Sequence, residues 1–121
     1  MGQKVAVIED DPDVAALLRQ VLGSEGFQVT LIRDGAKALP ILETSSFDVV
    51  ILDVMLPGKD GVTVMREIRE NPLTQRLPVV MLSAKVDDQT MWNGWRAGCD
   101  LYLSKPFDSE KLVQAMRKVM A

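Results

Sequence analysis

Five short apolar runs, spread along the whole chain, constrain the fold more than any other feature of the sequence. They are rich in valine, isoleucine and leucine and mostly unbroken, which is typical of strands covered on both faces. The runs are KVAVI (4–8), QVTLI (28–32), DVVIL (48–52), PVVML (78–82) and LYL (101–103). Segments with helical periodicity lie between them. Strands that alternate with helices in this way predict an α/β domain, with a parallel sheet covered by helices on both faces.

The residues that begin and end helices agree with this pattern. Asp11 and Pro12 match the N-cap and first turn of the first helix, and Gly26 matches its end. Asp108 matches the N-cap of the last helix. Pro40 is the exception, because it lies inside DGAKALPILETS and so predicts a kinked or irregular second helix.

Composition narrows the class of protein. The 121 residues are enough for one domain with a core, and no linker or repeat interrupts them, so we expect residues 1–121 to form a single domain. The formal net charge is -3 with no histidine, which argues against direct nucleic-acid binding by this domain.

Cys99 is the only cysteine, so it cannot form an internal disulfide and is expected to be buried. No apolar run approaches the ~18 residues of a membrane span and no signal-peptide pattern is present, so we expect a cytoplasmic location and no membrane partner.

Polar and charged side chains come where the predicted strands end. In an open parallel sheet the ligand site lies beyond the carboxyl ends of the strands, so these side chains should gather at one edge. They are Glu9 and Asp10 after the first run, Asp53 after the third, Ser83 after the fourth, and Ser104 and Lys105 after the fifth. Three carboxylates against one ammonium group leave an excess of about two negative charges, which a divalent cation would offset. All the donors are hard oxygens, which favours magnesium over zinc.

Each of these residues also has an ordinary structural explanation. Asp53 lies shortly before Leu-Pro-Gly and could be a turn former, while Asp11 and Asp13 suit helix-start charges better than metal ligands. A lone Ser83 or Lys105 is usually a solvated strand end. Their coincidence at one edge nevertheless favours a site. A carboxylate nucleophile, a magnesium ion and an ammonium group are what phosphoryl transfer to an aspartate requires.

Four segments carry a resemblance to a known family. VIEDD, VVILDVMLPGKDG, VVMLSA and LYLSKPF closely resemble the motifs of bacterial two-component response-regulator receiver domains, in the same order and spacing. The resemblance covers essentially the whole chain. It implies a flavodoxin-like (βα)5 fold with a five-stranded parallel sheet of order 2-1-3-4-5. It also implies phosphorelay signalling by a phosphoacceptor that assists its own phosphorylation and dephosphorylation, rather than an enzyme that acts on a free substrate.

The resemblance further implies a role for each residue of the metal site. Asp53 would be the phosphoacceptor and also a ligand of Mg²⁺. Asp10 would bind the ion directly and Glu9 mainly through water. The backbone carbonyl of Met55 would complete the protein ligands.

The same resemblance implies the phosphoryl-binding and switch residues. Ser83 and Lys105 would bind the phosphoryl group, and the Lys105–Pro106 peptide bond would be cis. Tyr102 occupies the position of the switch aromatic, which would rotate inward as Ser83 moves toward the phosphoryl group. A minor inward population of Tyr102 should exist before phosphorylation, because a ligand can only shift an equilibrium that is already present.

Partners follow from the resemblance as well. The phosphodonor would be a sensor histidine kinase or a histidine phosphotransfer protein, and the signal would pass to a downstream effector domain or protein. On the first helix we expect Leu18 and Leu22 to face the sheet. Val14 and Leu17 would then lie toward the active-site edge as a docking surface, although burial of all four in the core is an equal alternative.

The fourth helix carries two tryptophans. Trp95 is expected to face the core. Met91 and Trp92 could form an exposed apolar patch for a partner, with ordinary partial burial of Trp92 slightly favoured. Leu101 and Lys111 stand where many receivers with DNA-binding outputs carry acids, so a phosphorylation-dependent homodimer through that face would lack its usual charge pairs.

Other families fit the sequence less well. A flavodoxin would need a phosphate-cradling first loop, whereas EDDPD (9–13) would repel phosphate. A dinucleotide-binding enzyme would need a glycine-rich turn after the first strand. A haloacid-dehalogenase-like phosphatase would need a second aspartate at Met55. A degenerate receiver that binds partners without phosphorylation remains the alternative, disfavoured because every site residue is present. The sequence does not decide between a stand-alone receiver and part of a larger regulator.

Overall fold

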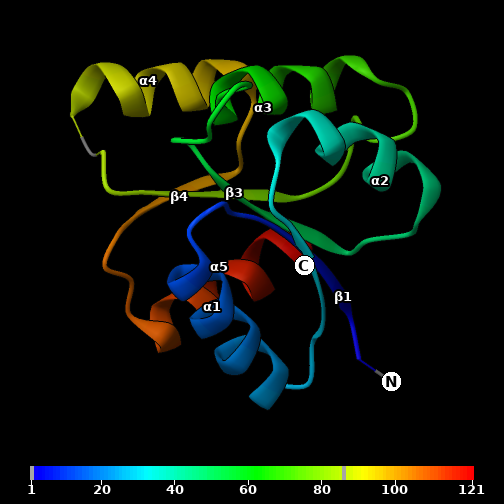
Figure 1. Cartoon of the computed structure of the whole chain (residues 1–121), viewed down its shortest axis with the longest axis vertical. Coiled ribbons are helices and arrows are strands. Elements are labelled where there is room, and N and C mark those ends of the chain that lie inside the picture. Colours follow the sequence, from blue (N-terminus) through cyan, green and yellow to red (C-terminus); the bar gives the residue numbers. More distant parts are fainter. Residues whose placement is uncertain (1, 86) are drawn as a thin grey trace.

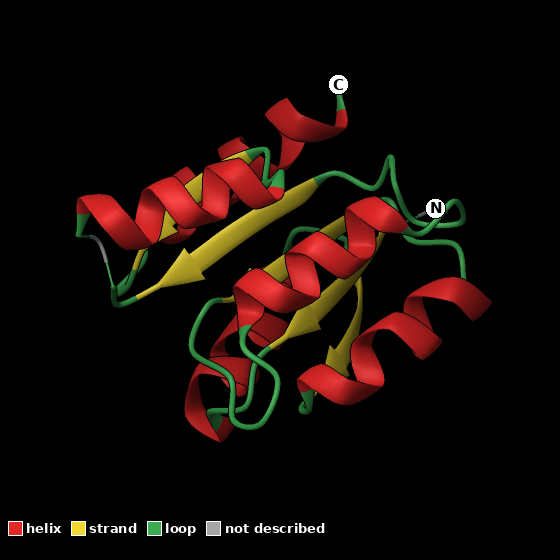
Figure 2. Ribbon diagram, turned by 90° about the horizontal axis from the view of Figure 1, so that it is seen from above, coloured by secondary structure: helices red, strands yellow, loops and turns green. Residues whose placement is uncertain are grey.

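The computed structural model describes residues 2–85 and 87–121 of the chain as one parallel sheet between two layers of helices (Figure 1). The strands are β1 (Lys4–Ile8), β2 (Gln28–Ile32), β3 (Val49–Asp53), β4 (Val79–Ser83) and β5 (Leu101–Ser104). Every neighbouring pair is parallel and the order is β2-β1-β3-β4-β5, so the arrows in Figure 2 all point the same way. The predicted fold class and strand order are confirmed.

Helices cover both faces of this sheet. The elements are α1 (Pro12–Ser24), the short 3-10 helix η1 (Gly35–Lys37), α2 (Ala38–Thr44), α3 (Gly61–Glu70), α4 (Asp88–Ala97) and α5 (Ser109–Met120). In Figure 1, α2, α3 and α4 lie above the sheet, while α1 and α5 lie below it. No helix in the described ranges has the length and hydropathy to cross a bilayer.

The unbroken apolar runs are explained by burial on both sides. In β1, Val5 and Val7 pack toward α1 and α5, whereas Ala6 and Ile8 pack toward the opposite layer. All residues of β3 and β4 are buried, while the edge strand β2 is largely exposed or half-buried. Since the side chains of the central strands β3 and β4 alternate between the two cores, their polar residues, Asp53 and Ser83, lie at the strand ends.

The helix boundaries follow the capping residues. The Asp11 carboxylate accepts hydrogen bonds from the backbone N–H groups of Asp13 and Val14 at the start of α1, and Asp108 caps α5 in the same way. Gly26 follows α1 with a left-handed φ of 92°. These three predicted boundaries are confirmed.

The second helix is irregular, as Pro40 predicts. The segment begins as the 3-10 turn η1, and α2 then runs for only 7 residues. Pro40 lies in the first turn of α2, where a backbone N–H has no partner within the helix, so its missing donor breaks no helical hydrogen bond.

The prediction that Trp95 faces the core is wrong. Trp95 is 42% exposed and Trp92 is 58% exposed, while Met91 is half-buried against the core. The inner face of α4 carries Gly94 and Ala97 instead. A Cβ atom at Gly94 would lie 3.0 Å from Met81 Sδ and 3.2 Å from a ring carbon of Tyr102, so α4 approaches the sheet too closely for a large side chain.

Gly61→Ala should destabilise the domain by about 1–3 kcal/mol, because an added Cβ would overlap the Asp53 carbonyl and approach Val54 Cα to 2.6 Å. Gly23→Ala, in an exposed turn of α1, is the matched control. Its added Cβ meets nothing within 4 Å, so the change should stabilise the domain by roughly 0.5–1 kcal/mol. Urea denaturation of the two variants measures both values, and equal stabilities would contradict the packing described for Gly61.

Candidate functional site

The strand ends place the predicted site residues at one edge of the sheet. Glu9 and Asp10 follow β1, Asp53 and Ser83 end β3 and β4, and Lys105 follows β5. The backbone ladder continues into this edge. The N–H of Glu9 donates to the Ile32 carbonyl at 3.0 Å, and the N–H of Lys105 donates to the Ser83 carbonyl at 2.9 Å. The side chains therefore start from backbone that the sheet itself holds in place.

Three carboxylates meet at this edge. One oxygen each of Glu9, Asp10 and Asp53 lies within 4.8 Å of the other two. Glu9 is 2% exposed and Asp53 is 4% exposed, so water screens their charges poorly. Asp10 is half-buried and lies toward the solvent side of the group.

Lys105 is the cation that faces these carboxylates. Its Nζ lies 2.6 Å from Glu9 Oε1 and 3.3 Å from Asp53 Oδ2. Burial alone would lower the pKa of Lys105, but the hydrogen bond to Glu9 and the charge of Asp53 outweigh that effect, so the pKa is raised. The ammonium group thus stays charged between two acids.

One ammonium group does not balance three acids. The pKa of Glu9 is raised to about 7, chiefly by burial; the hydrogen bond from Lys105 lowers this pKa, and the neighbouring Asp53 raises it. The possible metal ligands here are carboxylate oxygens of Glu9, Asp10 and Asp53, which lie close together. This donor set fits a hard divalent cation such as Mg²⁺.

Asp53 is held at both of its carboxylate oxygens. The backbone N–H of Met55 donates to Oδ1 at 3.1 Å, and Lys105 contacts Oδ2. Met55 is 52% exposed, and its hydrogen bond to Asp53 is made by its backbone.

Comparison with known proteins identifies the family. A family model described as the response regulator receiver domain matches residues 5–117. The chain belongs to this family.

Two curated relatives show how much of a longer protein this receiver corresponds to. The DNA-binding response regulator MtrA of Mycolicibacterium smegmatis is 40% identical over 97% of this chain and 50% of its own length. The phosphate regulon transcriptional regulatory protein PhoB of Rhizobium meliloti is 38% identical over 99% of this chain and 53% of its own length. The chain therefore spans about half the length of these relatives.

Solved receivers have the same architecture. The receiver domain of a sensor histidine kinase from Pseudomonas aeruginosa PAO1 is 32% identical, with a TM-score of 0.93 over 99% of this chain and 98% of that one. That structure has a magnesium ion coordinated in its active-site cleft. A response-regulator candidate from Chloroflexus aurantiacus is 35% identical, with a TM-score of 0.95 and coverage of 99% and 98%.

The expected switch residues of this receiver meet at the loop after β4. Ser83 is fully buried, and its Oγ accepts a hydrogen bond from the Lys85 N–H at 3.1 Å. The Tyr102 hydroxyl donates to the Lys85 carbonyl, and the ring is only 8% exposed. Burial raises the pKa of this phenol. Tyr102 is therefore already inward in this structure, where we expected that state to be the minor one before phosphorylation.

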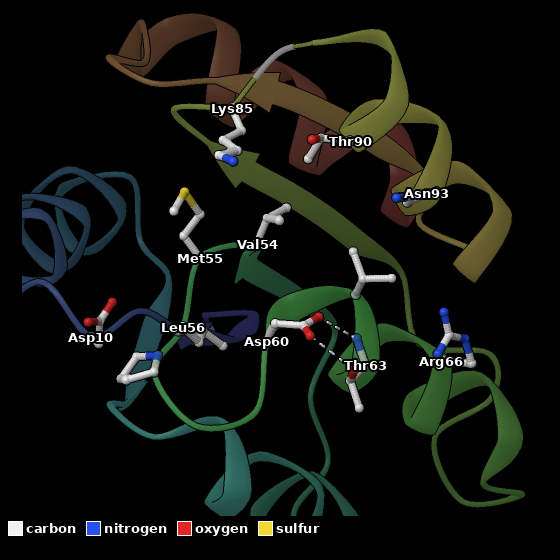
Figure 3. A pocket seen from close by; sticks show the side chains of 12 residues that line it. Asp10, Val54, Met55, Leu56, Asp60, Thr63, Arg66, Lys85, Thr90 and Asn93 are labelled. Atoms are coloured by element: carbon white, nitrogen blue, oxygen red, sulfur yellow. Dashed lines mark hydrogen bonds between the residues drawn. The ribbon is translucent and has the colours of Figure 1, made fainter.

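An open groove of about 830 Å³ lies beside the carboxylates, between the first turns of α3 and α4 (Figure 3). Asp10 and Met55 line one part of it, and Lys85, Thr90 and Asn93 line another. Sequence reasoning missed Lys85 and Thr90. The available signal was position, because Lys85 comes two residues after the strand-end Ser83.

The remaining predicted residues lie outside this cluster. Leu17 is 48% exposed on α1 and Val14 is half-buried, while Leu18 and Leu22 are fully buried beneath them. Met91 and Trp92 lie on α4. The peptide bond between Lys105 and Pro106 is cis.

In the absence of divalent ions, the stability of this receiver should fall as pH rises from about 4.5 to about 7. The folded chain holds the Glu9 proton up to a pKa of about 7, whereas the unfolded chain releases it near the ordinary value of 4.5. The expected loss of unfolding free energy is at most about 3 kcal/mol, since one pKa unit corresponds to roughly 1.4 kcal/mol.

Urea denaturation with a chelator across this range measures the effect. Glu9→Gln is the control that isolates it, because other carboxylates titrate over the same range. Stability curves of the two proteins that stay parallel from pH 5 to pH 8 would show that Glu9 does not carry this proton.

Proposed function

We propose that this chain is a phosphorelay phosphoacceptor that takes a phosphoryl group from a phospho-histidine partner onto Asp53. The observation that carries the proposal is the pairing of Asp53 with Lys105 at 3.3 Å, inside a group of three carboxylates. A carboxylate aimed at an ammonium group and a cation site has the parts that phosphoryl transfer to aspartate needs.

Mg²⁺ fits the acidic cluster as cofactor. Asp10, Asp53 and the Met55 carbonyl would bind the ion directly, and Glu9 would act mainly through water. The bound ion would neutralise charge on the transferring phosphoryl oxygens. The magnesium seen in the similar Pseudomonas receiver supports this assignment.

The side chains of the chain itself account for the transfer. An Asp53 carboxylate oxygen forms a bond to phosphorus as the phosphorus–nitrogen bond of the phospho-histidine breaks, and the electron pair of that bond stays on the imidazole. Lys105 neutralises the phosphoryl oxygens. Ser83, whose hydroxyl oxygen accepts a hydrogen bond from the Lys85 N–H, would donate its own proton to a phosphoryl oxygen.

The chain would act as a signalling domain that assists its own phosphorylation and dephosphorylation, and not as an enzyme for a free substrate. Its partners would be a sensor histidine kinase or histidine phosphotransfer protein, and a downstream effector. We place it in the cytoplasm, as one receiver domain over residues 1–121. The net charge of -3 argues against nucleic-acid binding by this domain, whatever a longer protein containing it would do.

Phosphorylation would change the surface formed by α4, β5 and α5. A phosphoryl group that takes the Ser83 hydroxyl loosens the Ser83 bond to Lys85, and Lys85 is also held by Tyr102. The inward Tyr102 is then one of two states whose balance the phosphoryl group shifts. If this coupling is right, Ser83→Ala weakens the response of α4 to a phosphoryl mimic.

Residues on the surface of α4, β5 and α5 bear on how the signal would pass to a partner. Trp92 and the half-buried Met91 offer apolar area for a partner on α4. A phosphorylation-dependent homodimer through this face stays open, although Leu101 and Lys111 cannot supply acidic partners for charge pairs. A pseudo-receiver that binds without phosphorylation is the alternative function, and it would not require the observed contact of Lys105 with Asp53.

Incubation with magnesium and a small acyl phosphate should add one phosphoryl group to the chain, because the site supplies nucleophile and cation without the kinase. Intact-mass measurement detects the adduct. Asp53→Asn should abolish it, and Glu25→Gln, an exposed carboxylate on the far side of α1, is the matched control. An adduct that survives in Asp53→Asn, or that forms equally well in excess chelator, would overturn the assignment.

Leu17→Ser should slow phosphotransfer from the cognate kinase by roughly tenfold, since an exposed apolar anchor is worth about 1–2 kcal/mol in such an interface. Phosphorylation by the small donor and the urea midpoint should stay unchanged, because Leu17 is 48% exposed. Loss of stability in this variant would instead show that Leu17 belongs to the core.

A further inference from the structure

Arg69, in the last turn of α3, joins several backbone segments near the end of α4. Its Nε donates to the Gly98 carbonyl at 2.9 Å. Its Nη1 donates to the carbonyls of Leu77 at 2.7 Å and Gln75 at 3.2 Å, and its Nη2 contacts Asp100 Oδ2 at 3.0 Å. A guanidinium group with acceptors on two loops, between α3 and β4 and between α4 and β5, resists movement of either loop.

The end of α4 is built to receive this side chain. Gly98 is the C-cap residue with a left-handed φ of 106°, and its N–H donates to the Trp95 carbonyl at 3.0 Å. A Cβ atom at Gly98 would lie 2.9 Å from Arg69 Cγ, so glycine also makes room for the arginine. Asp100 Oδ2 accepts a second hydrogen bond, from the Val79 N–H at 2.8 Å, which ties the same group to β4.

The start of α4 is held far less firmly. Asp87 caps it through Thr90, at 3.0 Å to the backbone N–H and 2.8 Å to the hydroxyl, and both partners belong to the same turn. In the described residues 84–85 and 87–93, the only hydrogen bond from another strand or helix, apart from that of Ser83 itself, comes from Tyr102 to the Lys85 carbonyl. The two ends of one helix therefore differ in how they are attached.

We propose that Arg69 is a positioning residue that fixes the C-terminal end of α4, so that activation displaces mainly the N-terminal end of the helix, about a pivot at Gly98. The inference rests on the proposed function, because phosphorylation supplies the driving change at Ser83 and Tyr102. Motion follows the weakly attached end, since local opening starts where few contacts to the rest of the structure must break. The pivot converts a small change at Lys85 into a directed displacement of the first turns of α4.

Trp92 and Trp95 lie on opposite sides of this division. Trp92 belongs to the half that would move, while the Trp95 carbonyl is bonded to the fixed Gly98. Both side chains are exposed, and activation would displace Trp92 further than Trp95, which lies closer to the pivot. A partner that reads the switch would then contact the N-terminal half of α4.

Hydrogen–deuterium exchange of the full chain, with and without magnesium and beryllofluoride as a phosphoryl mimic, tests the pivot. In the wild-type chain the mimic should change exchange in segment 88–93 and leave segment 95–100 unchanged. In Arg69→Gln, segment 95–100 should exchange about tenfold faster without the mimic, as expected for loss of a hydrogen-bonded cap, and should now respond to it. Arg117→Gln, an exposed arginine on α5, is the matched control and should behave as the wild type.

A purely structural role for Arg69 would speed exchange in the variant without moving the response to the mimic along α4. Arg69→Lys keeps the charge but not the planar set of donors, so only partial recovery is expected. Equal responses in both halves of wild-type α4, alongside a response around Asp53, would overturn the pivot alone. No response anywhere in the wild-type chain, including around Asp53 and Lys105, would overturn the proposed function and the pivot with it.

Discussion

Three crowded carboxylates face one ammonium group in this receiver, and this imbalance of charge is the constraint on which the rest of the site depends. Like charges within 4.8 Å repel strongly where burial removes water, and Lys105 can contact only Glu9 and Asp53. Burial is the main cause of the raised pKa of Glu9, and the neighbouring Asp53 adds to it. A bound cation would stabilise such a site, and the proposed phosphoryl transfer would depend on that added positive charge.

The fold places the charged groups of this site at one edge of an otherwise apolar central sheet. Every residue of β3 and β4 is buried between two layers of helices, and all of them except the terminal Asp53 and Ser83 are apolar. The buried carboxylates Glu9 and Asp53 lie at the carboxyl ends of the strands, where helix starts and loops leave an open groove. The same backbone ladder that stabilises the sheet continues through Glu9 and Lys105, and it sets the separation of the acids and the lysine.

These rules explain what could be predicted from the sequence. Strand-end residues such as Asp53 and Ser83 could be located because the end of an unbroken apolar run marks the end of a buried strand, and parallel strands bring these ends to one edge. Trp95 was misplaced because hydrophobicity favours the large side chain for the core, whereas close approach of α4 to the sheet selects Gly94. The interactions of Arg69 were not foreseen, since its partners are backbone carbonyls of distant loops and carry no pattern in the sequence.

The inward position of Tyr102 links the charge imbalance to the shape of α4. The ring fits beneath the helix only because Gly94 leaves space there, and its hydroxyl reaches the same residue, Lys85, that Ser83 binds. In the proposed switch, a change of charge at Asp53 would reach the helix through hydrogen bonds to one backbone segment, with no rearrangement of the core. Because Arg69 contacts the far end of the helix independently of this segment, a local change at the site would become a change of orientation, without unfolding of α4.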